Sequence, residues 1–346
     1  MQTTHNKIGF HRLRNLSAIK QTLRVLALLV VTSANLFAQG NLLSLEAQAV
    51  GSYNDDDRSI NWYSQDPHEA MQKPSVGVDY LYRAGSATRD YGYLSLQARL
   101  AYDDAEANNL RLQIYNAFVT LKQPGVDLWL GHHKTALGLS SYLNNHALLM
   151  MDNTMSALNF DRDWGLGLVF DRQKPIVSIA ATTGSGMPLY VKDNYLLTAR
   201  IAVGEYSKEN YSFGLSGGFG RTLRSMGYEI MHNKATHEYK TVGVDFSKRY
   251  LSLYTNGDLL YGSYHEKRAY SGLLRLGYYL LQEDKASVEL QAMAGELTGA
   301  KSQSYAAGLT YHVSSDVSIR SMFSHIQPEN TNTISLQLYL LKDFVF

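Results

Sequence analysis

The chain has 346 residues, 32 Lys and Arg against 31 Asp and Glu, and no Cys. The lack of Cys excludes a disulfide framework and thiol chemistry. The near-balance of charge excludes the basic excess that nucleic-acid-binding proteins use.

Residues 1–38 have the three-part pattern of a secretion signal. Five basic residues and no acid lie in residues 1–24, and an apolar run follows at 25–31. This run is shorter than the ~20 residues of a transmembrane helix. We expect cleavage after Ala38, with Ala34 as the alternative. Loss of five basic residues would change the net charge from +1 to −4, so a nucleic-acid partner is not expected.

From residue 39 onward the chain repeats about ten residues of alternating polarity followed by a turn. In the segment 94–100, Leu94, Leu96, Ala98 and Leu100 fall on one face. The intervening residues Ser95, Gln97 and Arg99 fall on the other. A period of two residues predicts β-strands. The same period recurs at 44–50, 76–80, 110–115, 197–203, 242–246, 274–278, 288–292 and 317–323.

These strands could form a soluble sandwich or a barrel in lipid, and three features favour the barrel. The strands approach the ~9–11 residues of a tilted span, their polar faces carry charges at mid-strand, and many of the 25 Tyr lie near strand ends. The last strand, 331–346, alternates and ends on Phe346. It resembles the final strand of outer-membrane barrels, which the barrel-assembly machinery recognises.

We predict an all-β fold, a transmembrane antiparallel β-barrel of 16 strands, with 14 or 18 as alternatives. Single-chain bacterial barrels have an even number of strands. The count requires 222–237 to be a loop or hairpin tip, and 39–346 to be one domain without a separate plug. Short turns at the periplasmic end are predicted at 103–109, 123–126, 172–175, 207–210, 248–250, 282–285 and 314–316.

A long insert, 137–162, separates two predicted strands at 126–135 and 163–172. It alternates poorly, and 146–151 could form a short helix. Long loops without secondary structure are usually functional. Because this one is apolar, we expect it to fold into the lumen and narrow an aqueous channel.

The region around this insert resembles the phosphate-selective porin O/P family. The resemblance is carried by the segments 131–134, 137–139 and 159–165. It implies a homotrimeric anion channel with basic residues at the constriction, and it assigns Lys134 and Arg162 to that role. His132 and His133 stand where the family has Gln-Phe, and a Pro usual after the Lys is absent.

Alternation also predicts which charged residues face the lumen. The basic candidates are Arg83, Arg99, Arg111, Lys134, Arg200, Arg275 and Arg320, and the acidic ones are Glu46, Asp79, Asp245, Asp258 and Glu289. Most such charges in barrels are solvated wall. Lys134 and Arg162 could contact solutes; alternatively, Asp163 could pair with Arg162 and fix the root of the loop.

No cofactor, metal site or catalytic site is expected. His132 and His133 are neighbours on a strand and point to opposite faces. Ser140, Ser141 and His146 do not match the short signature of outer-membrane lipases.

The sequence therefore predicts a non-enzymatic porin in the outer membrane of a Gram-negative bacterium, surrounded by outer-membrane lipids. Small hydrophilic solutes, with anions such as phosphate foremost, would diffuse through it. The alternatives are a barrel serving attachment, secretion or assembly, and a lipid hydrolase.

Overall fold

The computed structural model describes residues 38–346 except 57, 69–71, 87, 105, 107, 140–148, 156–157, 172–173 and 232–233. The expected signal sequence lies outside the described residues, apart from Ala38, where the first strand begins. Ser140, Ser141 and His146 also lie outside them.

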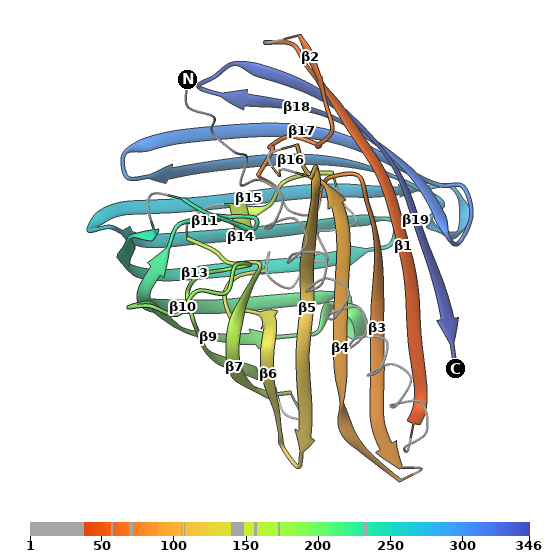
Figure 1. Cartoon of the computed structure of the whole chain (residues 1–346), viewed down its shortest axis with the longest axis vertical. Helices are drawn as coiled ribbons and strands as arrows, with labels where there is room; N and C mark the ends of the chain where they lie inside the picture. The colour runs from red at the N-terminus through yellow and green to blue at the C-terminus, as the bar shows by residue number, and fades with distance from the viewer. Residues whose placement is uncertain are drawn as a thin grey trace, which may run out of the picture.

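The described residues form a closed antiparallel barrel of 16 long strands (Figure 1). Each strand pairs with its neighbours in chain order, and β1 closes the barrel by pairing with both β3 and β19. The strands are β1 (Ala38–Asn54), β3 (Ser75–Ser86), β4 (Arg89–Tyr102), β5 (Leu110–Gln123), β6 (Val126–Lys134), β7 (Arg162–Phe170), β8 (Ile176–Thr182), β9 (Tyr195–Val203), β10 (Tyr211–Leu223), β13 (Thr236–Tyr250), β14 (Leu253–Tyr264), β15 (Lys267–Leu280), β16 (Ala286–Leu297), β17 (Ala300–His312), β18 (Val317–Gln327) and β19 (Thr331–Val345). The predicted 16-stranded barrel is confirmed.

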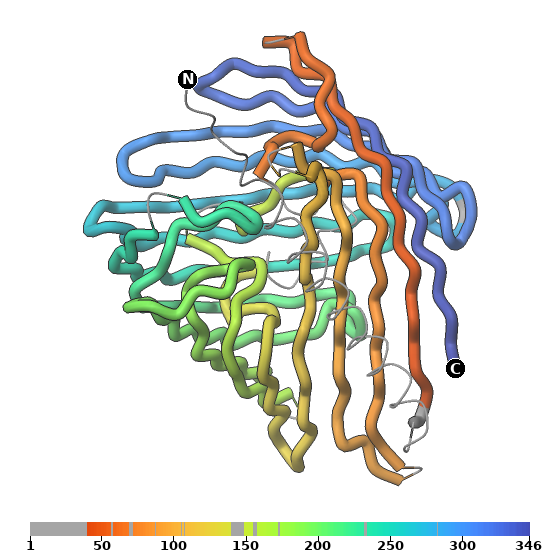
Figure 2. The backbone as a smooth tube through the Cα atoms, in the orientation of Figure 1, coloured from red at the N-terminus to blue at the C-terminus, as the bar shows by residue number. Residues whose placement is uncertain are grey.

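The two ends of the described chain meet in the seam between β1 and β19. Figure 2 shows these strands side by side, with register from Leu42 opposite Val345 to Asn54 opposite Thr333. The last residue is held as well, because Asn41 and Phe346 exchange two backbone hydrogen bonds of 3.1 and 3.0 Å. Phe346 is thus an integral part of the barrel edge.

One end of the barrel holds the start of β1 and the end of β19, and it is called here the terminal end. Its connections are short. They include α2 (Tyr206–Glu209) and η4 (Gln282–Asp284). The opposite end, called the loop end, carries the long connections and also the hairpins at 265–266 and 298–299. The turn 103–109 lies at the loop end, whereas the other six turns that were predicted to be periplasmic lie at the terminal end, so the prediction that all seven share one end is wrong. Its short length was a poor guide, because both ends contain short turns.

The segment 224–235 is a hairpin tip, as the strand count required. β10 ends at Leu223 and β13 begins at Thr236, and between them β11 (Ser225–Met226) pairs only with β12 (Glu229–Ile230). A further short strand, β2 (Ser59–Asn61), extends the pairing of β1 at the loop end.

The barrel wall is polar inside and apolar outside. In β9, for example, Leu197 and Ile201 are exposed whereas Thr198 and Arg200 are buried. Exposed apolar side chains on other strands include Val76, Leu112, Leu130, Leu166, Ile179, Leu215, Phe219, Val242, Val244, Leu259, Leu274, Leu276, Leu290, Leu309, Ile319, Phe323, Leu336 and Leu338. A soluble sandwich would bury these residues, whereas a barrel in lipid exposes them to acyl chains.

No helix among the described residues is long and apolar enough to cross a membrane.

Candidate functional site

The loop between β6 and β7 runs along the inner wall of the barrel. Its first residues donate backbone hydrogen bonds to side chains on three strands of that wall. The bonds are Ala136 N to Thr198 Oγ1 on β9 (3.3 Å), Gly138 N to Ser216 Oγ on β10 (3.1 Å) and Leu139 N to Asp258 Oδ2 on β14 (3.2 Å). This confirms the prediction that the loop folds into the lumen.

Gly138 is required for this close approach. Its φ is +63°, in the left-handed region, and a Cβ at this position would lie 2.9 Å from an Asp258 carboxylate oxygen. A side chain here would force either the loop or the Asp258 carboxylate to shift, because a Cβ essentially never approaches another heavy atom this closely.

The second half of the loop crosses to β15 and β16. Asn153, in the short helix η2 (Asn153–Met155), accepts from Ser271 Oγ at 2.8 Å and donates to the backbone oxygen of Asp258 at 3.2 Å. Gln291 donates to the Met151 oxygen at 2.7 Å. Of the helix predicted at 146–151, only 149–151 is described, and that part is not helical.

Two of the predicted lumen arginines are neutralised by bidentate ion pairs. Arg99 donates from Nε to Glu46 Oε2 at 2.8 Å and also through Nη2. Arg200 donates from Nε to Asp245 Oδ2 at 2.9 Å and from Nη2 to Oδ1 at 2.5 Å. All four residues are buried. Such pairs leave little net charge to act on a solute.

Arg111 belongs to an ionic cluster at the loop end. Its guanidinium lies 2.9–3.0 Å from the carboxylates of Asp103, Glu106 and Glu229. Glu229 lies on β12, and its carboxylate also lies 3.0 Å from Nδ1 of His68. The adjacent Tyr228 donates its hydroxyl to the Ile114 oxygen at 2.7 Å. The hairpin of β11 and β12 therefore leans from the β10 side of the barrel onto β5.

Arg162 is held by three neighbours at the root of the loop. It donates to Asp161 Oδ1 at 2.6 Å and to Asn116 Oδ1 at 2.8 Å, and its guanidinium lies 3.5 Å from the centre of the Tyr115 ring. Lys134 is half-buried and lies opposite Arg162 in the strand register. The structure thus brings together Lys134 and Arg162, the two residues that the family resemblance assigns to the constriction.

The predicted pairing of Asp163 with Arg162 is wrong. The Asp163 carboxylate accepts instead from the Thr183 hydroxyl (2.6 Å) and from backbone N–H groups that include that of Gly184 (2.5 Å). It therefore anchors the connection between β8 and β9. The error has a local cause: Asp161, the residue on the other side of Arg162, is the one whose side chain points toward the guanidinium.

Arg275 and Arg320 differ from the other lumen arginines because their partners are neutral. Arg275 donates to Gln291 Oε1 and Arg320 to Gln337 Oε1, both at 2.8 Å. Arg320 also lies 4.6 Å from the centre of the Tyr339 ring. In the part of the chain that the structure describes, neither guanidinium forms a salt bridge.

The remaining predicted lumen residues have mixed surroundings. Arg83 is exposed near the terminal end of β3, and Asp79 is only partly buried. Glu289 accepts a hydrogen bond from the Tyr254 hydroxyl. Gln291 and Gln337, which hold the two unpaired arginines, were not singled out from the sequence, although their inward position follows from the same alternation.

The two adjacent histidines have separate environments. His133 stacks on Phe118 with ring centroids 3.9 Å apart, and His132 stacks on Trp164 at 4.8 Å. Among the described residues there is no group of three His, Asp or Glu side chains that could hold a metal ion.

Comparison with known proteins gives a match in structure alone. No family model and no curated protein matches the chain. An anion-selective porin from Comamonas acidovorans superposes with a TM-score of 0.60 at 9% identity, over 89% of this chain and 100% of that one. The outer membrane channel DcaP of Acinetobacter baumannii gives 0.58 at 13%, over 88% and 98%. The trimer form of OmpT, an outer membrane protein of Vibrio cholerae, gives 0.57 at 12%, over 88% and 99%.

These similarities show that the chain shares its fold with outer-membrane β-barrel proteins. At such low identities they establish the architecture and leave solute and selectivity to be argued from this chain's own residues.

Proposed function

We propose that the protein is an outer-membrane porin through which small hydrophilic solutes diffuse passively. The observation that carries this proposal is the inverted wall, apolar outside and charged inside, with a loop tethered across the lumen. An apolar exterior requires lipid, and a polar interior with a tethered loop is the arrangement of a restricted aqueous channel.

Liposome swelling tests this proposal directly. Vesicles containing the purified protein should swell in isotonic solutions of small uncharged sugars, and the rate should fall steeply as the sugar grows. If the vesicles swell no faster than protein-free vesicles, the barrel is not an open pore, and a role in attachment, secretion or assembly becomes the better proposal.

We further propose a weak preference for anions, located at Arg275 and Arg320. Arg99, Arg111, Arg162 and Arg200 each contact a carboxylate, whereas Arg275 and Arg320 hydrogen-bond to neutral glutamine side chains and form no salt bridge with a described carboxylate. The preference is weak because Asp258 and Glu289 lie on the same side of the barrel. The structurally similar Comamonas porin is described as anion-selective.

Phosphate is the particular anion that the resemblance around the loop suggests. A phosphate bound at Lys134 and Arg162 would have to displace Asp161, which already occupies the Arg162 guanidinium at 2.6 Å. The test is block of chloride current by added phosphate in Lys134→Ala and Arg162→Ala. Block that persists in both variants would place any phosphate site elsewhere.

We also propose that the porin is a homotrimer that associates through the outer wall of β7 to β10. β8 has only seven residues, against 12–15 in β13 to β16. At about 3.3 Å per residue and a tilt of about 45°, its seven residues rise about 16 Å, less than the ~25 Å apolar band. A wall this low is better covered by protein than by lipid.

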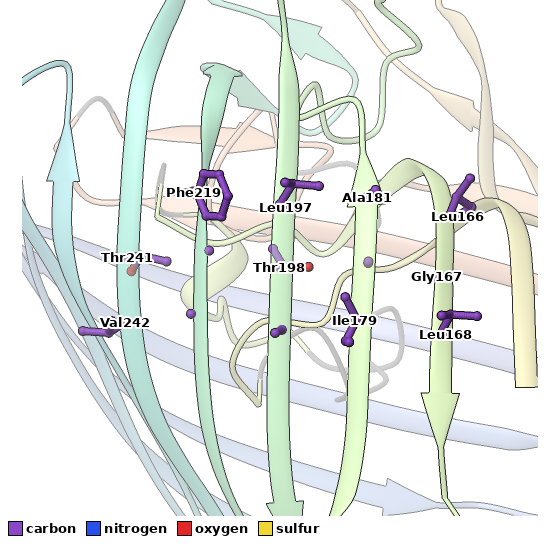
Figure 3. Close-up of a pocket in the computed structure, with 14 residues that line it drawn as sticks. Leu166, Gly167, Leu168, Ile179, Ala181, Leu197, Thr198, Phe219, Thr241 and Val242 are labelled. Carbon is purple, nitrogen blue, oxygen red and sulfur yellow. The ribbon is translucent and has the colours of Figure 1, made fainter. Parts of the chain in front are cut away.

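A groove of about 600 Å³ on this outer wall offers a packing surface. Figure 3 shows Leu166 and Leu168 on β7, Ile179 on β8 and Leu197 on β9 around it. Small residues such as Ala199 form its floor. Ala199→Arg should dissociate the oligomer in detergent, as measured by light scattering. The control Leu276→Arg, on the outer face of β15, should leave it intact.

A further inference from the structure

A row of polar side chains, two of them cationic, lies on the outer face of the barrel at the loop end. Lys240 on β13, Ser263 on β14 and Arg268 on β15 lie opposite one another in register. Lys240 points outward, because its neighbours Tyr239 and Thr241 are buried. Paired residues of adjacent strands project to the same face, so Ser263 and Arg268 point outward too.

The next row toward the terminal end has a different composition. It runs from Val242 through Tyr261 and Tyr270 to Glu296 and Lys301. Outward-facing aromatic residues at the edge of an apolar band mark the level of the lipid headgroups. The Lys240 row lies two residues beyond, about 7 Å along the strand. Its charges therefore lie at the depth of lipid phosphates.

These cations are less tightly paired with carboxylates than the cations at the terminal end. There, Lys208, Arg249 and Lys342 each lie within 2.5–2.8 Å of a carboxylate. At the loop end the closest approaches are longer: Lys240 is 4.0 Å from Glu238, and Arg268 is 3.7 Å from Glu296.

The side chains of Lys240 and Arg268 are 72% and 63% exposed, against 73% for Lys208, so the longer separation from a carboxylate is what distinguishes the loop end. Separations this long are weak ion pairs, and an external anion can compete with them.

We propose that the surface formed by Lys240, Ser263, Arg268 and Lys301, called here the basic rim, binds the phosphate groups of a phosphorylated glycolipid in the leaflet at the loop end. Arg268 can bind a phosphate through two N–H donors in place of its 3.7 Å approach to Glu296. The ammonium group of Lys240 lies on one side of Arg268, and that of Lys301 lies beyond Glu296 on the other. The Ser263 hydroxyl between Lys240 and Arg268 supplies a further donor. Placing this leaflet on the cell exterior rests on the proposed function.

The test compares lipids by native mass spectrometry of the full-length protein in detergent. The probes are bisphosphorylated lipid A, the same lipid after enzymatic dephosphorylation, and phosphatidylglycerol. The test variant is Lys240→Gln with Arg268→Gln and Lys301→Gln. The control is Lys208→Gln with Arg249→Gln and Lys342→Gln, which removes the same number of charges from the terminal end.

We expect wild type and control to bind lipid A equally. The test variant should bind it at least about tenfold less tightly, since each basic residue near a lipid surface contributes roughly a fivefold effect. Dephosphorylated lipid A should bind wild type as weakly as intact lipid A binds the test variant. Equal binding of lipid A by test and control variants would overturn the proposal, as would equal affinity of wild type for phosphatidylglycerol.

Channel recordings on the same preparations separate this inference from the proposed function. Conductance should be unchanged in the test variant, because the basic rim lies outside the lumen. If no variant conducts but the basic rim still selects lipid A, the porin proposal fails while this inference stands.

Discussion

Asp258 links the position of the loop to the charge of the lumen, and two substitutions separate these roles. Its carboxylate accepts from Leu139 N at 3.2 Å, and its backbone oxygen accepts from Asn153. Asp258→Ala leaves the buried N–H of Leu139 without this acceptor, at a cost of about 1–3 kcal/mol. At about 2 kcal/mol, the population of the released loop would rise roughly 30-fold.

Single-channel recording in planar bilayers measures this effect. Asp258→Ala should show brief transitions to a higher conductance that are rare in wild type. Asp258→Asn keeps an oxygen acceptor at the same position, so transitions to the higher conductance should stay rare. Its anion permeability should increase, because a negative charge is lost from the lumen. If Asp258→Ala is as quiet as wild type and conducts equally, the loop is not restrained by this contact and the reasoning fails.

Three further predictions follow from buried or cross-lumen contacts. Glu46→Gln leaves Arg99 buried without its counter-charge and should destabilise the folded barrel by about 3–5 kcal/mol in urea titrations; a loss below 1 kcal/mol would contradict the buried pair. Burial, reinforced by nearby Asp161, raises the pKa of Asp152 in the loop to about 7, so protonation at lower pH removes a negative charge and anion preference should rise as pH falls through 7. Asp152→Asn should abolish this pH dependence, and an unchanged profile would exclude Asp152 as its source. Glu229→Gln weakens the contacts of β12 with Arg111 and His68, so proteolysis within the 224–235 hairpin should accelerate several-fold, whereas the exposed control Glu238→Gln should not change it.

The fold could be predicted because its determinants are local. Alternation with a period of two, charged residues at mid-strand and an apolar insert are all visible in the sequence, and they require a barrel whose polar face points inward. The hairpin at 224–235 could also be predicted from the sequence, because an additional membrane-spanning strand there would have broken the up-and-down order. The turn at 103–109 was misplaced because turn length does not identify the end of a barrel.

The pairing of the candidate residues could not be predicted, because it depends on register between distant strands. Arg99 reaches Glu46 across Gly77, whose missing side chain makes room for it: a Cβ there would lie 2.6 Å from Arg99 Cγ. Only the three-dimensional structure shows that this arginine is ion-paired, whereas Arg275 and Arg320 hydrogen-bond to glutamines. The Arg162 and Asp163 error has a different, local origin, because adjacent residues on a strand point to opposite faces and Asp163 therefore meets Thr183 and Gly184 instead.

The most direct test of the account is the reversal potential of the purified protein in a planar bilayer under a potassium chloride gradient. Wild type should form channels with a modest anion preference, and Arg275→Gln with Arg320→Gln should shift the reversal potential toward cations. The control Lys208→Gln, at the terminal end, should behave as wild type. A preference unchanged by the double substitution would contradict the assignment of selectivity to these two arginines, and the absence of channels would contradict the porin function itself.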